Sequence, residues 1–274
     1  MKKYIFIDID GTLTNSKKEV SQNNIDALEK IKEKDVEIIF CSGRCNTYLI
    51  NLSKKCHASR YIISSNGSMI YDQKNQTIIH SNNIPFELLK RIYDYCCDNK
   101  MAITFNSENS RYCNANINYN NHYQKEDTNK ITDIQTIKDK NITQICIGSY
   151  DYDKMITIKE FLNTIPEIEI VNISTTIKEH QKDSKDGFFY DVVLKGINKG
   201  TGITNFINHI NTTKDNCIAI GDHINDIDMF KAVNYKIAMG NAYDELKKHA
   251  NFITKSNDED GVKYALEHLT KEIL

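Results

Sequence analysis

Proline, glycine and long apolar runs are scarce in this chain. Its 274 residues include 2 Pro, 11 Gly and no Trp, which is unlike the composition of collagen-like or disordered proteins. No stretch approaches the roughly 18–20 apolar residues that cross a membrane, so we predict no membrane-spanning segment. The apolar N-terminal stretch meets Asp8 and Asp10 before a signal-peptide core can form, and we therefore expect no secretory signal.

An excess of one charge is also absent. The 35 Lys and Arg residues nearly balance the 37 Asp and Glu residues, for a formal net charge of -2, so no overall basic field favours a nucleic-acid partner. The 8 cysteines form no Cys-x-x-Cys pair, and several lie in strand-like or helix-like apolar stretches. We expect reduced, buried thiols rather than disulfides or a zinc site, and a cytoplasmic protein.

What the chain does contain is an alternation of strand and helix patterns. Short, nearly continuous apolar runs predict strands that are covered on both faces. These runs are Tyr4–Ile7, Val36–Phe40, Tyr61–Ile63, Cys217–Ile220, Tyr235–Met239 and Phe252–Thr254. Helical patterns lie between most of them, and the first begins at Ser21, a good N-cap residue. The alternation predicts an α/β fold with a doubly wound, Rossmann-like parallel sheet.

The middle of the chain breaks this alternation. It reads as a helix over 86–98, followed by strand-like pieces and a second helix, with hairpins in place of crossovers. An Asn- and Tyr-rich stretch at 114–123 is typical of a surface loop. Because the length also fits two domains, we predict a core domain of residues 1–82 and 192–274, interrupted by an inserted α+β domain of residues 83–191.

Carboxylates and other polar residues collect where the predicted strands end, which is the edge at which open parallel sheets bind ligands. Asp8 and Asp10 follow the first strand, and Lys199 stands just before a helix. The other polar residues at these strand ends are Ser42, Asp222, Asn225 and Asp226. Clustered ionised carboxylates need a cation, and oxygen ligands favour Mg²⁺. The lysine, hydroxyl, amide and neighbouring glycines suit a phosphoryl group.

The two carboxylates after the first strand suit covalent catalysis. One could attack phosphorus to give an aspartyl-phosphate. The second, two residues further on, could protonate the leaving alcohol and then activate water. The same residues could instead be ordinary turn and capping residues, but their occurrence together favours the catalytic interpretation.

Four motifs resemble those of the haloacid dehalogenase (HAD) superfamily. They are DxDGT at 8–12, SGR at 42–44, Lys199, and GDxxND at 221–226. Three further stretches, SSNGS at 64–68, GINKGTGI at 196–203 and MGNA at 239–242, resemble the Cof-type sugar-phosphatase branch. Because the insertion falls between the second motif and the lysine, it resembles a C2-type cap. That resemblance implies a domain that closes over the site and contacts the substrate.

The resemblance also implies a role for each motif residue. Asp8 would be the nucleophile and Asp10 the general acid and base. Mg²⁺ would bind Asp8, the backbone carbonyl of Asp10, and Asp222. The phosphate would be held by Ser42, the backbone N–H of Gly43, Lys199 and Asn225. Asp226 would orient Lys199 or a metal-bound water from behind the site.

Three further residues have two interpretations each. Asn66, in the SSNGS stretch, could line the substrate pocket or simply tolerate a left-handed turn. His223 stands where the family usually has a small residue, and it could contact the substrate or point to solvent. Arg44 could contact the phosphate, but we expect a structural ion pair instead.

Together these residues predict a Mg²⁺-dependent phosphatase that hydrolyses small phosphomonoesters, such as sugar phosphates or related metabolites, through phospho-Asp8. The sequence leaves the oligomeric state open, and a cap that closes over its own core can work in a monomer. A phosphotransferase or mutase acting on sugar phosphates is one alternative, and the position of the insertion argues against it. A catalytically silent phosphate-binding regulatory protein is the other, and the presence of both Asp8 and Asp10 argues against that.

Overall fold

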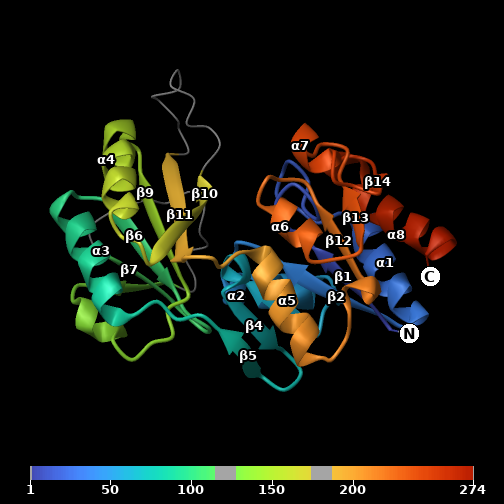
Figure 1. The fold of residues 1–274 in the computed structure, drawn as a ribbon, viewed down its shortest axis with the longest axis horizontal. Helices are drawn as coiled ribbons and strands as arrows, with labels where there is room; N and C mark the ends of the chain where they lie inside the picture. The colour runs from blue at the N-terminus through green and yellow to red at the C-terminus, as the bar shows by residue number, and fades with distance from the viewer. Residues whose placement is uncertain (1, 115–127, 174–186, 274) are drawn as a thin grey trace. The chain divides into compact units, whose positions relative to one another are not determined.

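The computed structural model describes residues 2–114, 128–173 and 187–273. The chain divides into two compact units. The first, which we call the core unit, comprises Met1–Arg44, Tyr48–His80 and Asn198–Leu274. The second, the inserted unit, comprises Cys45–Thr47 and Ser81–Ile197 (Figure 1). The sequence pattern predicts these two changes of domain at 82/83 and 191/192.

The core unit is built on an eight-stranded sheet in the order β14-β13-β12-β1-β2-β3-β4-β5. Its strands are β1 Lys3–Ile7, β2 Val36–Cys41, β3 Tyr61–Ser64, β4 Met69–Asp72, β5 Thr77–Ser81, β12 Cys217–Gly221, β13 Tyr235–Ala238 and β14 Phe252–Ile253. All neighbours from β14 to β3 pair in parallel, which confirms the predicted parallel sheet. β4 runs antiparallel to β3, and the sequence pattern missed both β4 and β5.

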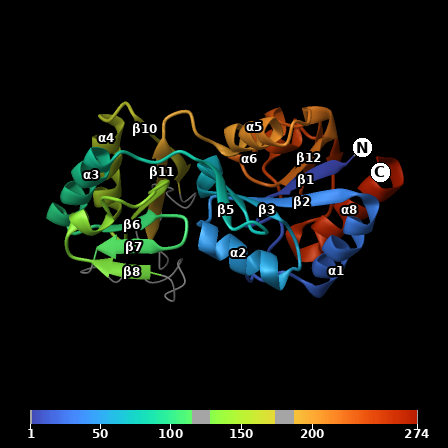
Figure 2. The same cartoon turned by 90° about the horizontal axis from the view of Figure 1, so that it is seen from below.

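Helices cover both faces of this sheet. They are α1 Gln22–Ile31, α2 Asn46–Lys55, α5 Lys199–His209, α6 Asp226–Lys231, α7 Asp244–Lys247 and α8 Gly261–Glu272. α5 and α6 lie on one face, and α1 and α2 lie on the other (Figure 2). The strands between them are buried on both sides, as Ile5, Phe6 and Ile7 of β1 show with no exposed surface. Ser21 caps α1, because its Oγ accepts the N–H of Asn24 at 3.2 Å.

The inserted unit is α+β, as predicted. Its six-stranded sheet has the order β10-β11-β9-β6-β7-β8. The strands are β6 Ala102–Asn106, β7 Arg111–Asn114, β8 Thr128–Ile131, β9 Gln144–Ser149, β10 Ile168–Ile173 and β11 Phe188–Leu194. The pairs are antiparallel except β7 with β8, which are parallel. The hairpin interpretation therefore failed at β8, which the sequence pattern had not identified.

Helices α3 Phe86–Asp98 and α4 Tyr152–Asn163 pack on one face of that sheet. Alternate strand residues, such as Ile103 and Phe105 of β6, point into the apolar core that these helices cover. The predicted loop at 114–123 lies outside the described residues, apart from Asn114 at the end of β7.

All eight cysteines lie in described parts of the chain, and none of them is in a disulfide. Six are buried, Cys97 is exposed and Cys113 is half-buried, so the prediction of buried cysteines outside disulfides is confirmed for six of the eight. Within the described ranges, no helix is both long enough and apolar enough to cross a membrane.

Candidate active site

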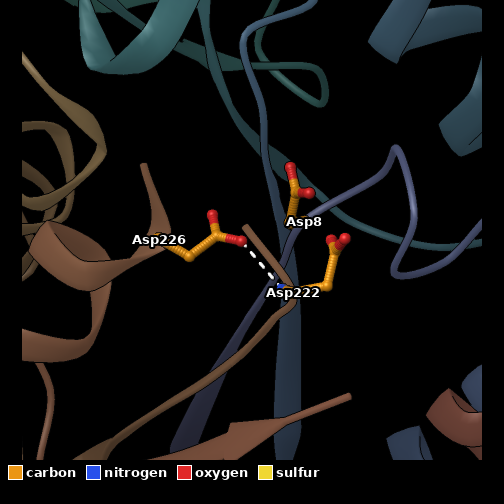
Figure 3. A group of neighbouring side chains, drawn as sticks. All are labelled: Asp8, Asp222 and Asp226. Carbon is orange, nitrogen blue, oxygen red and sulfur yellow. Dashed lines mark hydrogen bonds between the residues drawn. The ribbon is translucent and has the colours of Figure 1, made fainter. Parts of the chain in front are cut away.

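Three buried carboxylates meet at the carboxyl ends of β1 and β12. Asp8, Asp222 and Asp226 each place a ligand oxygen within 4.8 Å of the others, and they are 4%, 8% and 0% exposed. Figure 3 shows the three side chains together, with Asp226 turned toward the backbone of Asp222. The sheet topology brings Asp8 and Asp222 together, because β1 and β12 are parallel neighbours with Ile7 opposite Ile220. The residues that follow the two strands must therefore lie side by side.

The turn after β1 is shaped to let Asp222 approach. Gly11 has a φ of +81°, and a Cβ at this position would lie 2.4 Å from Oδ2 of Asp222. Any other residue would both strain the backbone and displace the carboxylate. Thr12 donates its hydroxyl to Oδ1 of Asp222 at 2.7 Å. Thr12 is the last residue of the DxDGT motif, but the sequence alone assigns it no role.

Lys199 is inserted between two of the carboxylates. It begins α5, whose N-cap Asn198 accepts the N–H of Thr201. Its Nζ lies 2.6 Å from Oδ1 of Asp8 and 2.6 Å from Oδ1 of Asp226, and the residue is only 2% exposed. Burial alone would lower the pKa of Lys199, but the two carboxylates outweigh it and raise the pKa. The ammonium therefore stays charged.

Asp226 accepts hydrogen bonds through both of its carboxylate oxygens. While one oxygen accepts from Lys199, the other accepts the backbone N–H groups of Asp222 at 2.9 Å and His223 at 3.0 Å. Both oxygens are thereby engaged with the protein. This geometry fits the role implied for Asp226, which is to orient Lys199.

The charges of this cluster do not balance. Three buried carboxylates face one ammonium, and unpaired buried charge is costly. Burial, reinforced by Asp226 and Asp222, raises the pKa of Asp8 in spite of Lys199. Burial and Asp226 raise the pKa of Asp222 to about 7, against the hydrogen bond from Thr12. A hard cation fits here, since every available donor is an oxygen.

Asp10 and Arg44 form an ion pair through two hydrogen bonds. Arg44 Nε lies 2.7 Å from Oδ2 of Asp10, and Nη2 lies 2.5 Å from Oδ1. The Asp10 side chain is 44% exposed. Its partial desolvation would raise its pKa, but the hydrogen bond and charge of Arg44 prevail and lower it. The ion pair predicted for Arg44 is confirmed, although the sequence did not identify Asp10 as its partner.

The remaining candidates lie on the neighbouring loops. Ser42, 2% exposed, follows β2, and its Oγ accepts the N–H of Arg44. Asn225 precedes α6, and its Oδ1 has no hydrogen-bond partner among the residues described. His223 is half-buried with its ring edge-on to Tyr243, 4.9 Å between centroids, and burial lowers its pKa. Asn66 is buried in the turn after β3.

Comparison with known proteins decides the family. The sequence profile of the haloacid dehalogenase-like hydrolases matches residues 5–266. The chain belongs to this family. Among HAD-like hydrolases it is of the Cof type, as its motifs indicated.

Curated HAD-like relatives match over nearly their whole length. A 5-amino-6-(5-phospho-D-ribitylamino)uracil phosphatase of Bacillus subtilis, YcsE, is 29% identical over 97% of this chain and 95% of its own. A phosphoglycolate phosphatase of Methanobrevibacter smithii is 27% identical over 96% of each chain. A crystal structure of a HAD-like hydrolase from Bacteroides thetaiotaomicron covers 98% of this chain and 100% of its own, with a TM-score of 0.83 and 27% identity.

Proposed function

We propose that this hydrolase is a Mg²⁺-dependent phosphatase of small phosphomonoesters, working through an aspartyl-phosphate on Asp8. The observation that carries the proposal is the buried Asp8 carboxylate, held at 2.6 Å by Lys199 and close to Asp222. The relatives named above are phosphatases of small phosphorylated metabolites. They support sugar phosphates or related metabolites as the substrate class.

The chain's own groups supply the binding steps. Ser42, the Gly43 backbone N–H, Lys199 and Asn225 would hold the phosphoryl oxygens. Asp8 and Asp222, with the backbone carbonyl of Asp10, would hold Mg²⁺, which would neutralise charge on the phosphoryl group. Lys199 fixes the Asp8 carboxylate in one orientation, so that little reorganisation is needed when it attacks.

The reaction then has two halves. An Asp8 oxygen forms a bond to phosphorus while the bond from phosphorus to the ester oxygen breaks, and Asp10 gives that oxygen a proton. Asp10 next takes a proton from water as the water oxygen attacks phosphorus, which releases inorganic phosphate and regenerates Asp8. The ionised form of Asp10, which Arg44 favours, is the form that this second half needs.

A transfer or regulatory function would use the same pocket differently. A mutase would pass the phosphoryl group to a second sugar, and a regulatory protein would bind phosphate without turnover. We assign substrate choice to the inserted unit, as its resemblance to a C2-type cap implies. The free thiols fit a reducing cytoplasm, and a single copy of the chain carries every candidate residue.

A panel assay tests the proposal. Purified protein with Mg²⁺ is given p-nitrophenyl phosphate and a set of phosphorylated metabolites, and inorganic phosphate is measured. We expect Mg²⁺-dependent release that Asp8→Asn abolishes and that Asp26→Asn, an exposed change on α1, leaves intact. Release by Asp8→Asn would disprove the covalent route. Phosphoryl transfer without net release would support the mutase instead.

A further inference from the structure

The turn that follows β3 has an unusual backbone. Ser65, Asn66 and Gly67 have successive φ values of +51°, +55° and +96°. L-residues rarely adopt this left-handed region, and a run of three persists only where surrounding contacts hold it. Backbone strain of this kind is concentrated at functional sites.

Hydrogen bonds tie this turn to the loop that carries Ser42 and Gly43. The N–H of Ser65 donates to the carbonyl of Arg44 at 2.9 Å, and the N–H of Asn66 donates to the carbonyl of Ser42 at 3.1 Å. On the other side, a Cβ at Gly67 would lie 2.0 Å from the carbonyl of Asn198, the residue before Lys199. The turn therefore packs between the 42–44 loop and the start of α5, and both of these segments carry phosphate-binding candidates.

The side chain of Asn66 is enclosed and unsatisfied. The residue is 2% exposed, and neither Oδ1 nor Nδ2 has a hydrogen-bond partner within the described parts of the chain. Its amide lies against Gly43, with Oδ1 2.9 Å and Nδ2 3.0 Å from the position that a Cβ there would occupy. Buried side-chain amides are nearly always paired. The Asn66 amide therefore has an unused donor, Nδ2, and an unused acceptor, Oδ1, beside the loop that carries Ser42.

We propose that the Asn66 amide is a substrate-binding group, a role that rests on the phosphatase function proposed above. Nδ2 donates to a phosphoryl oxygen held on the 42–44 loop, and Oδ1 accepts a hydroxyl proton from the same substrate. A ligand that satisfies both atoms must carry an acceptor and a donor close together. Among the phosphomonoesters proposed above, Asn66 would therefore favour those that carry a hydroxyl group near the phosphate.

A purely conformational role for Asn66 would give different results. Asn tolerates left-handed backbone better than most residues, and Gly tolerates it better still. Asn66→Gly therefore keeps the turn and removes only the amide. Asn211 is a matched control, because it is exposed and has a φ of +52° outside the site. Asn211→Gly makes the same chemical change there.

The test measures phosphate affinity, KM and thermal stability together. Calorimetry on Mg²⁺-loaded protein should show inorganic phosphate binding about tenfold weaker in Asn66→Gly, as loss of a charge-assisted hydrogen bond predicts, and unchanged in Asn211→Gly. KM should rise more for a sugar phosphate than for p-nitrophenyl phosphate, which has no neighbouring hydroxyl. Asn66→Asp should bind phosphate more weakly still, because its carboxylate repels the anion. The unfolding midpoint should not fall in Asn66→Gly.

Two results would overturn the assignment. One is wild-type phosphate affinity and KM in Asn66→Gly. The other is equal loss for both substrates in both Asn66 variants together with a lower unfolding midpoint, which would make Asn66 a folding residue. Failure of the phosphatase proposal is distinguishable from either. In that case the wild type releases no phosphate from any ester, while its affinity for inorganic phosphate still depends on Asn66.

Discussion

Arg44 holds the Asp10 carboxylate by two parallel hydrogen bonds that link motifs 34 residues apart in the chain. A paired guanidinium and carboxylate of this geometry fixes the orientation of both groups. The acid and base proposed for the reaction is therefore already positioned, and its charge state is set by a residue of the second motif.

Removing Arg44 should move the pH profile of turnover. Arg44 lowers the pKa of Asp10, so Arg44→Gln should raise the pKa of Asp10. The proposed hydrolysis of the aspartyl-phosphate needs ionised Asp10, so the acidic limb of kcat should shift to higher pH. Arg60→Gln breaks an equivalent pair with Asp72 away from these motifs and should leave the limb in place. If the acidic limb of the kcat–pH profile did not shift in Arg44→Gln, Arg44 would not control the pKa of Asp10 during turnover.

Lys199 should be essential to stability as well as to activity. Lys199→Met leaves Asp8 and Asp226 buried without their cation, and loss of one partner of a buried pair costs about 3–5 kcal/mol. Denaturant titration should show that loss, and phosphatase activity should disappear. Lys231→Met removes an ion pair whose lysine side chain is 70% exposed, and it should change stability by less than about 1 kcal/mol. Equal effects of the two variants would refute the buried-pair account.

Asp222 should link stability to pH and to Mg²⁺. Its pKa in the folded protein is about 7, against an ordinary value of 3.8. The folded state thus binds this proton more tightly than the unfolded state. Its contribution to stability is full below about pH 4 and is lost as pH rises through about 7.

Metal-free protein should therefore lose more thermal stability between about pH 5 and about pH 8 than Asp222→Asn does. Mg²⁺ should restore more at the higher pH, because the metal binds ionised carboxylates. Thermal unfolding with EDTA and with Mg²⁺ at each pH measures both effects. Parallel curves for wild type and Asp222→Asn would rule this linkage out.

Gly11 should tolerate no side chain. Gly11→Ala strains a backbone with φ of +81° and places a methyl group 2.4 Å from the Asp222 carboxylate. We expect at least about 1 kcal/mol of destabilisation and loss of Mg²⁺-dependent activity. Gly196→Ala has nearly the same φ, +80°, but no atom of the described residues lies within 4 Å of the new Cβ. Gly196→Ala should therefore lose stability through backbone strain but keep its activity. Comparable activity in the two variants would argue against a steric clash between a Gly11 side chain and Asp222.

The sequence predicted the core strands well because their burial on both faces produces continuous apolar runs, as at Val36–Cys41. Helix α3 was also placed correctly over Phe86–Asp98, where apolar residues recur at helical spacing. β4 and β8 were missed. β8 has a single apolar residue, Ile131, among its four, so no apolar run marks it. β4 ends in a charged residue, Asp72, and follows β3 after a short turn, so no intervening helix separates the two strands.

The candidate site could be predicted as a set of residues but not as a set of contacts. Asp8 and Asp222 could be identified because each follows a buried strand, and Lys199 because it stands between glycines just before a helix. The pairing of Arg44 with Asp10 depends on side-chain orientations that no local pattern encodes. The unsatisfied amide of Asn66 is likewise visible only when the atoms around it are in place.

The neighbouring positions of β1 and β12 bear on how the protein is made. Asp8 is synthesised before the inserted unit, whereas β12, which lies beside β1, begins at Cys217, after that unit. Throughout synthesis of the inserted unit, β1 lacks this neighbour and Asp8 lacks both Lys199 and Asp226. The carboxylate cluster therefore assembles only after β12 and the start of α6 have been made, and a chain truncated after the inserted unit carries Asp8 without Lys199, Asp222 and Asp226.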